Sequence, residues 1–247
     1  MPKRPSGTNL SIFLLFCAAP LISRAQDQPS VAKDAFDITS ESLYYPHRFK
    51  PGDLKLELAI SQVKLPFDWL ETSVQAPLLH FHANYALPAN FTLDGRFSSL
   101  IVANQITLGS RWQFMANRFS FNLGFDVAYA FGQLRQFGFD SSMDSWMNLP
   151  NASVGYRIDD LCFTLKAEAM ILTTLYMKQG DNFIETDKNM NNGYTIAFYI
   201  EQRIHHNLVI VLGLKNSYAK YHFIGWPAFS TFNRFYNIPE VYIGFIL

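Results

Sequence analysis

The segment from Phe119 to Phe131 reads Phe-Ser-Phe-Asn-Leu-Gly-Phe-Asp-Val-Ala-Tyr-Ala-Phe. Its odd-numbered positions are large and apolar, and its even-numbered positions are small or polar. Because side chains alternate between the two faces of a β-strand, this segment predicts a strand with one apolar and one small, polar face. Strands of this kind separate lipid from a polar interior in a membrane-spanning β-barrel.

The same alternation recurs along the chain and predicts an all-β, up-and-down antiparallel barrel of ten strands. The predicted strands lie near residues 53–61, 77–87, 91–100, 104–114, 119–132, 145–158, 161–172, 193–204, 208–217 and 239–247. Eight strands would follow if residues 53–61 form a plug and residues 218–238 are misread. Twelve would follow if residues 218–238 hold another hairpin.

Composition agrees with a chain that faces lipid. Charged residues make up 16% of its 247 residues, against about 25% in a typical soluble domain. The formal net charge is zero, so no nucleic-acid partner is expected. Beyond the N-terminus no apolar run is long enough for a transmembrane helix.

The N-terminus has the features of a secretory signal peptide over residues 1–25. Lys3 and Arg4 are positive, residues 10–22 are apolar, and residues 23–25 fit a cleavage site. The apolar run is too short for an anchor helix, the alternative reading. Residues 26–52 are predicted to be a periplasmic leader or to be partly tucked into the barrel mouth, and residues 53–247 to form the barrel.

The lengths of the predicted connections give an orientation. The connections near residues 62–76, 133–144, 173–192 and 218–238 are long, whereas those at the other end of the barrel are short. Outer-membrane barrels have short periplasmic turns and long extracellular loops. Both termini are therefore predicted to lie in the periplasm.

A soluble barrel, with its apolar faces inside, is the alternative fold. About eight strands are just filled by their own side chains, so a ten-stranded lumen would not hold all the large apolar side chains of these faces. The opposite faces are rich in Gly, Ala, Ser, Thr and Asn and carry few charges, unlike a solvated exterior. The pattern favours the membrane barrel.

The final strand, Val241 to Leu247, alternates bulky residues up to the last position. Aromatic residues gather near the predicted membrane surfaces, with Trp112 and Phe114 at one end and Trp146 and Tyr194 at the other. Over residues 53–247 the chain resembles the small Gram-negative outer-membrane barrels of the OmpA-like and OmpW-like class, although Leu247 stands where Phe is usual. The resemblance implies an outer-membrane location and contact with outer-membrane lipid.

Charges of both signs fall on the predicted lumen faces. The candidate network comprises Lys55, Glu57, Asp94, Arg96, Arg111, Asp126, Arg157, Lys166, Glu168, Glu201 and Arg203, with Lys215 and Glu240 on the same faces. Unpaired charges in a narrow lumen are costly, so the near balance predicts a closed, salt-bridged interior. A narrow selective pore is the alternative, although no ring of one sign is evident.

His80 and His82 lie two positions apart on one lumen face, and hairpin pairing predicts His82 opposite Arg96 and Asn84 opposite Asp94. Such a pair could bind a metal or serve catalysis. The sequence offers no Ser-His-Asp grouping, and Arg96 disfavours a cation. We therefore expect hydrogen-bonded lumen histidines, with no catalytic residue, metal or cofactor.

The connection over residues 218–238 is too aromatic for a solvated loop, so it either packs over the mouth or contacts a partner. The candidate partner-binding residues are Tyr221, Phe223, Trp226, Phe229, Phe232, Phe235 and Tyr236.

The sequence thus predicts a non-enzymatic outer-membrane barrel with a structural role or a role as an assembly subunit, whose partner would be another outer-membrane or surface protein. A narrow passive channel for small or hydrophobic solutes is the first alternative. A barrel enzyme that acts on lipid is the second.

Overall fold

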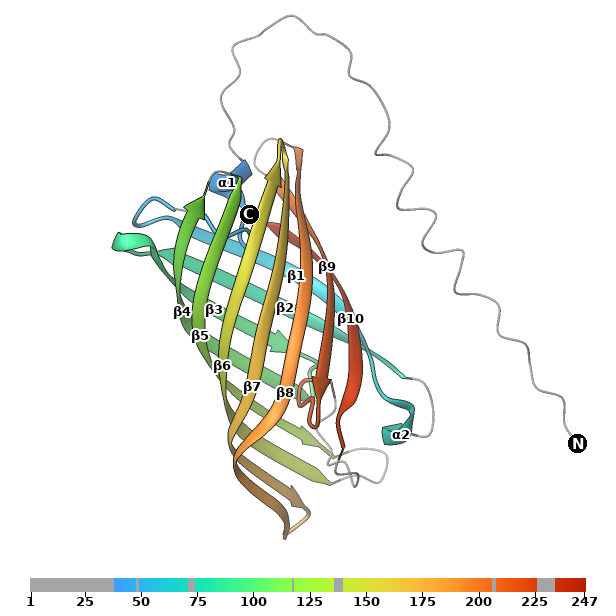
Figure 1. The fold of residues 1–247 in the computed structure, drawn as a ribbon. Coiled ribbons are helices and arrows are strands. Elements are labelled where there is room, and N and C mark those ends of the chain that lie inside the picture. Colours follow the sequence, from blue (N-terminus) through green and yellow to red (C-terminus); the bar gives the residue numbers. More distant parts are fainter. Residues whose placement is uncertain are drawn as a thin grey trace, which may run out of the picture. The chain divides into compact units, whose positions relative to one another are not determined.

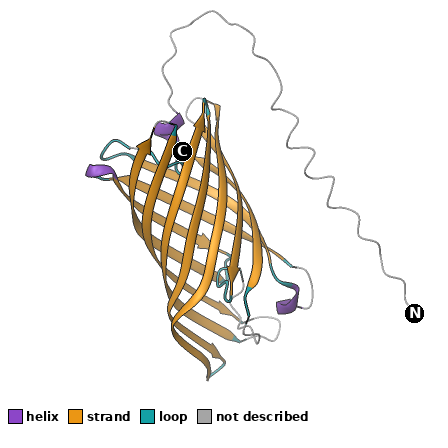
Figure 2. Cartoon of the chain, in the orientation of Figure 1, coloured by secondary structure: helices purple, strands orange, loops and turns teal. Residues whose placement is uncertain are grey.

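The computed structural model describes residues 38–47, 49–70, 74–116, 118–135, 140–205, 208–225 and 234–247. Ten strands dominate it (Figures 1 and 2). They are β1 Leu54–Lys64, β2 Gln75–Ala86, β3 Phe91–Ser99, β4 Ala103–Ala116, β5 Phe119–Leu134, β6 Ser141–Ile158, β7 Leu161–Gln179, β8 Asn182–His205, β9 Leu208–Ala219 and β10 Tyr236–Ile246. The short helices are α1 Ile38–Glu41, α2 Phe67–Leu70 and the 3₁₀ turn Pro88–Asn90.

Each strand pairs antiparallel with its sequence neighbours, and β1 also pairs with β10, which closes the barrel. The predicted ten-stranded, up-and-down antiparallel barrel is therefore confirmed. The register is also as predicted at the histidine pair, with His82 opposite Arg96 and Asn84 opposite Asp94. Among the described residues, no helix is sufficiently long and apolar to cross a membrane.

Connections at the two ends of the barrel differ as expected, with one correction. The prediction of a long loop over residues 173–192 was wrong, because β7 and β8 continue to the two-residue turn Gly180-Asp181. Gly180 has a φ of +58°, a conformation that glycine adopts without steric cost in a tight turn. The resulting hairpin is the longest in the barrel and projects at the end opposite the short turns (Figure 1).

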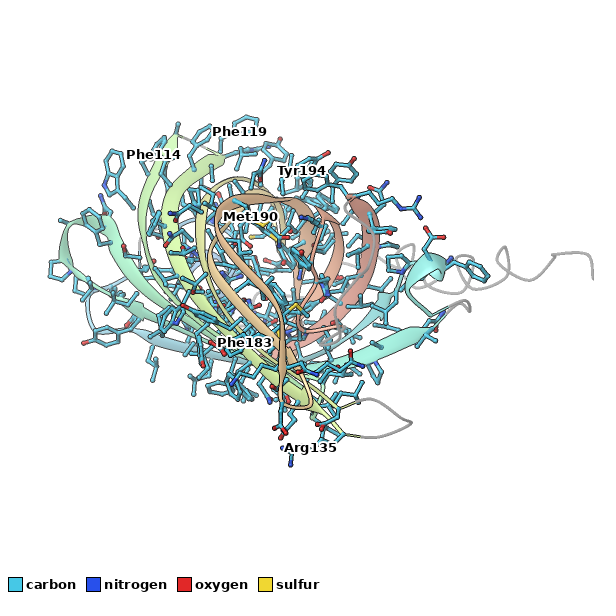
Figure 3. The ribbon with its side chains drawn as sticks, turned by 90° about the horizontal axis from the view of Figure 1, so that it is seen from below. Phe114, Phe119, Arg135, Phe183, Met190 and Tyr194 are labelled. Atoms are coloured by element: carbon cyan, nitrogen blue, oxygen red, sulfur yellow. The ribbon has the colours of Figure 1, made fainter. Side chains whose placement is uncertain are left out.

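An apolar belt surrounds the barrel at the end of the short turns. Its side chains are large and exposed, and Figure 3 shows Phe114 and Phe119 on the outer side of the wall. On β5 the belt runs from Phe119 to Phe131, which corresponds to about 28 Å along the barrel axis at a strand tilt of about 45°. That height matches the hydrocarbon core of a bilayer.

Beyond this belt the two faces of the strands exchange character. Many of the exposed residues there are polar, and they include Gln62, Lys64, Gln75, Lys178, Asn191, Asn216 and Asn237. Most of the buried residues there are apolar, and they include Val63, Leu78, Met143, Leu175, Met177 and Ile238. The barrel therefore changes from the pattern of a lipid-facing wall to that of a water-facing wall around an apolar core. This change marks where the strands leave the membrane.

Candidate functional site

The lumen consists of three layers that differ in chemistry. At the end of the short turns, residues 38–47, here called the N-terminal segment, lie against lumen-facing side chains of the barrel. Ionic clusters occupy the middle. The far end is filled by packed apolar side chains, here called the apolar chamber. Its buried members include Val63, Leu78, Met143, Met147, Leu149, Met170, Leu172, Leu175, Met177 and Ile238.

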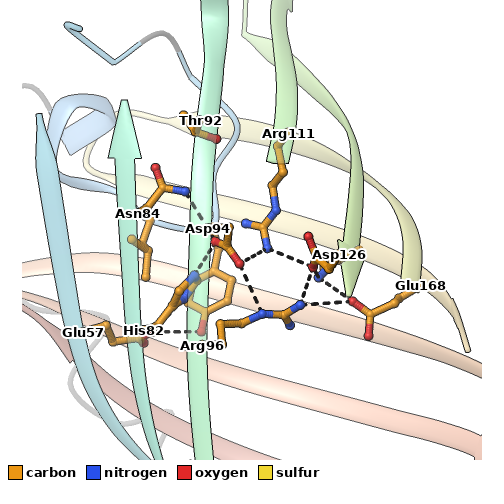
Figure 4. Close-up of polar contacts among 12 residues, drawn as sticks. Glu57, His82, Asn84, Thr92, Asp94, Arg96, Arg111, Asp126 and Glu168 are labelled. Atoms are coloured by element: carbon orange, nitrogen blue, oxygen red, sulfur yellow. Dashed lines mark hydrogen bonds and ion pairs between the residues drawn. The ribbon is translucent and has the colours of Figure 1, made fainter. Parts of the chain in front are cut away.

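Asp94 is the centre of the first ionic cluster (Figure 4). Its buried carboxylate lies 2.5 Å from His82 Nε2 through Oδ2. Its other oxygen, Oδ1, lies 2.7 Å from Arg111 Nη2 and 3.2 Å from Arg96 Nε. One carboxylate therefore faces two guanidinium groups and one imidazole, an arrangement that needs further negative charge close by.

Asp126 and Glu168 supply that charge (Figure 4). Asp126 Oδ2 contacts Arg96 Nη2 and lies 3.7 Å from Arg111 Nη2. Glu168 Oε2 lies 2.8 Å from Lys166 Nζ and 3.5 Å from Arg96 Nη2. Strands β3, β4, β5 and β7 thus each contribute charge to one network, called the Asp94 cluster. Such pairing offsets the cost of holding ions in a narrow lumen.

Two glycines make room for the Asp94 cluster. A Cβ atom at Gly109 would lie 1.9 Å from Asp126 Oδ1 on the paired strand. A Cβ atom at Gly124 would lie 2.9 Å from Arg111 Cγ. The long charged side chains therefore cross the lumen over positions that carry no side chain of their own.

A second cluster surrounds His80 and joins β1, β2, β3, β9 and β10. The imidazole lies between two hydroxyl groups, with Ser61 Oγ 2.7 Å from Nε2 and Ser98 Oγ 2.8 Å from Nδ1. Glu240 Oε1 is 3.5 Å from Nε2, and Lys215 Nζ is 2.7 Å from Glu240 Oε2. We call this group the His80 cluster.

A cavity of about 90 Å³ adjoins both clusters. Its lining includes the charged residues Arg96, Lys166, Glu168, Lys215 and Glu240, together with His80, Tyr44, Tyr199 and Tyr242. A polar space of this size holds a few water molecules. It is too small for an acyl chain or another extended substrate.

Glu201 holds the N-terminal segment in the lumen. Its Oε1 accepts hydrogen bonds from the backbone N–H groups of Leu43 and Tyr44 at 2.6 and 3.0 Å, and its Oε2 accepts one from Tyr45 at 2.7 Å. Glu57 joins the segment to the Asp94 cluster, because its Oε2 accepts from the Tyr44 hydroxyl at 2.9 Å and lies 3.4 Å from His82 Nδ1.

The chain after β9 turns inward over the apolar chamber. Asn192 fixes this turn, since its side chain donates to Tyr221 O at 3.0 Å and accepts from Tyr221 N at 2.8 Å. Tyr221 and Phe223 stack at 5.6 Å and are buried. Burial lowers the pKa of the neighbouring His222 to about 4, so its ring is neutral and Nδ1 accepts from Gly225 N–H at 3.2 Å.

Most of the network residues named from the sequence lie in or beside these clusters, Glu201 binds the N-terminal segment, and three others lie elsewhere. Lys55 contacts Glu41 of the N-terminal segment. Arg157 and Arg203 are half-buried at the ends of β6 and β8 nearest the short turns.

The partner-binding candidates have different environments. Tyr221, Phe223 and Tyr236 are buried, and Phe235 is 38% exposed. Trp226, Phe229 and Phe232 lie outside the described residues.

Sequence reasoning missed the tyrosines around Tyr44 and the two serines that contact His80. Tyr199 and Tyr242 alternate with outward-facing residues, so strand periodicity carried a signal for their position. Tyr44 belongs to no strand, so no periodicity could place it. Ser61 and Ser98 come from two strands on either side of His80, and only the full register brings them together.

Within the part of the chain that the structure describes, no group of three His, Cys, Asp or Glu side chains could hold a metal ion.

No family model matches the sequence, and no curated protein matches it. Among solved structures, the chain is similar to Neisserial surface protein A at 12% identity and a TM-score of 0.39, covering 78% of this chain and 96% of that one. It is similar to the attachment invasion locus protein Ail of Yersinia pestis at 10% identity and a TM-score of 0.40, covering 80% and 100%. It is also similar to the Pseudomonas putida toluene transporter TodX at 8% identity and a TM-score of 0.36, covering 84% and 94%.

These structures are outer-membrane β-barrels. The resemblance to such barrels that the sequence indicates is confirmed at the level of fold by the closed ten-stranded topology and the apolar belt. Similarities this low identify no subfamily.

Proposed function

We propose that the protein is a closed outer-membrane barrel with a structural role or a role as an assembly subunit, and that its water-facing end is the contact surface. The filling of the lumen is the observation that carries this proposal. The N-terminal segment, the two ionic clusters and the apolar chamber follow one another along the barrel axis.

Each layer disfavours a passive channel for a different reason. The carboxylates of the Asp94 cluster are paired with cations, so permeating ions meet a neutral, occupied region instead of a ring of one sign. The apolar chamber excludes ions because it offers them no hydration. A hydrophobic solute would have to displace packed side chains at one end and buried charges at the other.

A lipid-hydrolysing enzyme is disfavoured by size. Ser61 and Ser98 each place a hydroxyl group beside the His80 ring, an arrangement that resembles a nucleophile beside its base. The adjoining cavity of about 90 Å³ is nevertheless too small for a lipid substrate in a reactive pose.

Planar-bilayer recording tests whether the lumen is closed. We expect no discrete conductance steps from the purified barrel, with a known open porin as the positive control. Steps whose size changes in the Arg111→Ala or Glu168→Ala variant would instead assign the conduction path to this lumen and contradict the proposal.

Purification from native membranes tests the assembly role. We expect a second protein in fixed ratio that is lost in the Phe235→Ala variant, where an exposed ring just before β10 is removed. Phe125→Ala is the matched control, because Phe125 is also exposed but lies within the lipid-facing belt. Equal loss in both variants would indicate a general folding defect instead of a contact surface.

A further inference from the structure

The N-terminal segment contacts the barrel in the way that a bound peptide contacts its receptor. Three successive backbone N–H groups, of Leu43, Tyr44 and Tyr45, all donate to the single carboxylate of Glu201. A carboxylate that accepts several backbone N–H groups makes strong, charge-assisted hydrogen bonds. This contact recognises the conformation of the segment and not its side chains.

The side chain of Tyr44 adds sequence recognition. Its ring stacks on Tyr199 with the centroids 3.9 Å apart and the planes 20° apart. Its hydroxyl lies 2.9 Å from both Glu57 Oε2 and the Tyr242 hydroxyl. A ring at this position thus fills an aromatic slot with a hydrogen-bonding group at its end.

The wall is also shaped to the segment on its other side. Ile38, Leu43 and Tyr45 are at most 3% exposed. A Cβ atom at Gly155 of β6 would lie 2.6 Å from Tyr45 Cδ2 and 2.8 Å from Pro46 Cδ. Only a glycine at this point of the wall leaves room for the chain that passes it.

The segment is nevertheless not part of the wall. The strand ladder closes between β1 and β10, so every strand is paired without it. The contacts of Glu201, Tyr199 and Tyr242 with the segment come from side chains of the barrel and not from its ladder. The segment could therefore leave its place without opening the barrel.

We propose that the short-turn end of the lumen is a peptide-binding site whose resident ligand is residues 42–46 of this chain. Glu201 binds the three amides, and Tyr199, Glu57 and Tyr242 bind the Tyr44 side chain. The ligand class is a bent peptide that presents three successive free N–H groups to one carboxylate and carries an aromatic side chain at the middle of the three positions. This inference goes beyond the structural role. It states that the short-turn end of the lumen is closed by the N-terminal segment, and that this segment can leave and bind again.

The native thiol of Cys162 reports whether the site is occupied. Cys162 is fully buried near the start of β7, the strand that α1 contacts. In a Cys17→Ser background it is the only cysteine of the chain. We expect Glu201→Gln to raise its labelling rate by a water-soluble maleimide roughly tenfold or more, since charge-assisted hydrogen bonds are weakened.

Glu240→Gln is the matched control, because Glu240 is an equally buried lumen carboxylate whose contacts are Lys215 and His80. Its labelling rate should match that of the parent chain. An unchanged rate in Glu201→Gln, or an equal rise in both variants, would overturn the proposal.

Binding in trans provides the second test. A fluorescent peptide of residues 38–47 should bind the full chain carrying Leu43→Asp and Tyr44→Ala, whose own segment fits poorly. It should not bind the parent chain, where the site is filled, nor the same variant carrying Glu201→Ala. Equal binding to all three chains would overturn the proposal, as would no binding to a folded variant whose Cys162 is exposed.

Discussion

At the scale of single residues, Asp94 is the centre of the Asp94 cluster. Its side chain is fully buried and balances two arginines and His82. We expect Asp94→Asn to lower the free energy of unfolding by about 3–5 kcal/mol, because the cations would remain buried without their partner. Denaturant titration of the barrel in lipid vesicles measures this loss.

The exposed pair Arg135–Asp140 is the control for that prediction. Its atoms are 3.4 Å apart, and its side chains are 71% and 61% exposed. Asp140→Asn should change the free energy of unfolding by less than about 1 kcal/mol, since solvent screens such pairs. Similar losses of stability in the two variants would mean that solvent screens the lumen charges as strongly as it screens those on the surface.

Gly193 is constrained by both backbone conformation and space. Its φ is +126°, and a Cβ atom would lie 1.9 Å from Tyr218 O. Gly52 has a φ of +95° with nothing within 4 Å of such a Cβ atom. We expect Gly52→Ala to cost about 1–3 kcal/mol of stability from strain and Gly193→Ala about 1–3 kcal/mol more from the clash. Unfolding titrations of both variants separate the two effects, and equal losses would contradict the clash.

At the scale of elements, period-two alternation was sufficient to predict that there are ten strands, because a wall between lipid and a polar lumen imposes it on the membrane-spanning part of each one. The pattern did not predict that β7 and β8 continue over residues 173–192. The strands leave the membrane there, and their buried face becomes apolar. The pairing of His82 with Arg96 could be predicted because one hairpin sets it. The position of Tyr44 could not, since it depends on contacts with β1, β8 and β10.

The change of polarity along β7 can be tested within that strand. Leu175 is fully buried in the apolar chamber, whereas Leu165 is 48% exposed on the lipid-facing belt. We expect Leu175→Ala to cost about 2–5 kcal/mol of stability through the cavity that it leaves. Leu165→Ala should cost less, because lipid can fill the space. A larger loss for Leu165→Ala would contradict the assignment of the two faces.

At the scale of the whole molecule, the barrel has a lipid-facing part and a water-facing part, and the difference between its two ends predicts an orientation in an outer membrane. The long β7–β8 hairpin extends past the belt and carries exposed polar residues such as Asn182, Asn189 and Asn191, whereas the described connections at the opposite end are short turns at the edge of the belt. Since outer-membrane barrels keep short turns in the periplasm, we infer that the hairpin faces the outside and that both termini face the periplasm.

Cysteine labelling of whole cells tests this orientation in the Cys17→Ser background. Lys178 near the hairpin tip and Lys50 before β1 are both exposed, at opposite ends of the barrel. An impermeant maleimide should label Lys178→Cys on intact cells and Lys50→Cys only after the outer membrane is permeabilised. Phe198→Cys, within the belt, should remain unlabelled in both conditions because lipid covers it. Labelling of Lys50→Cys on intact cells would reverse the orientation, and labelling of Phe198→Cys would contradict the lipid-facing belt itself.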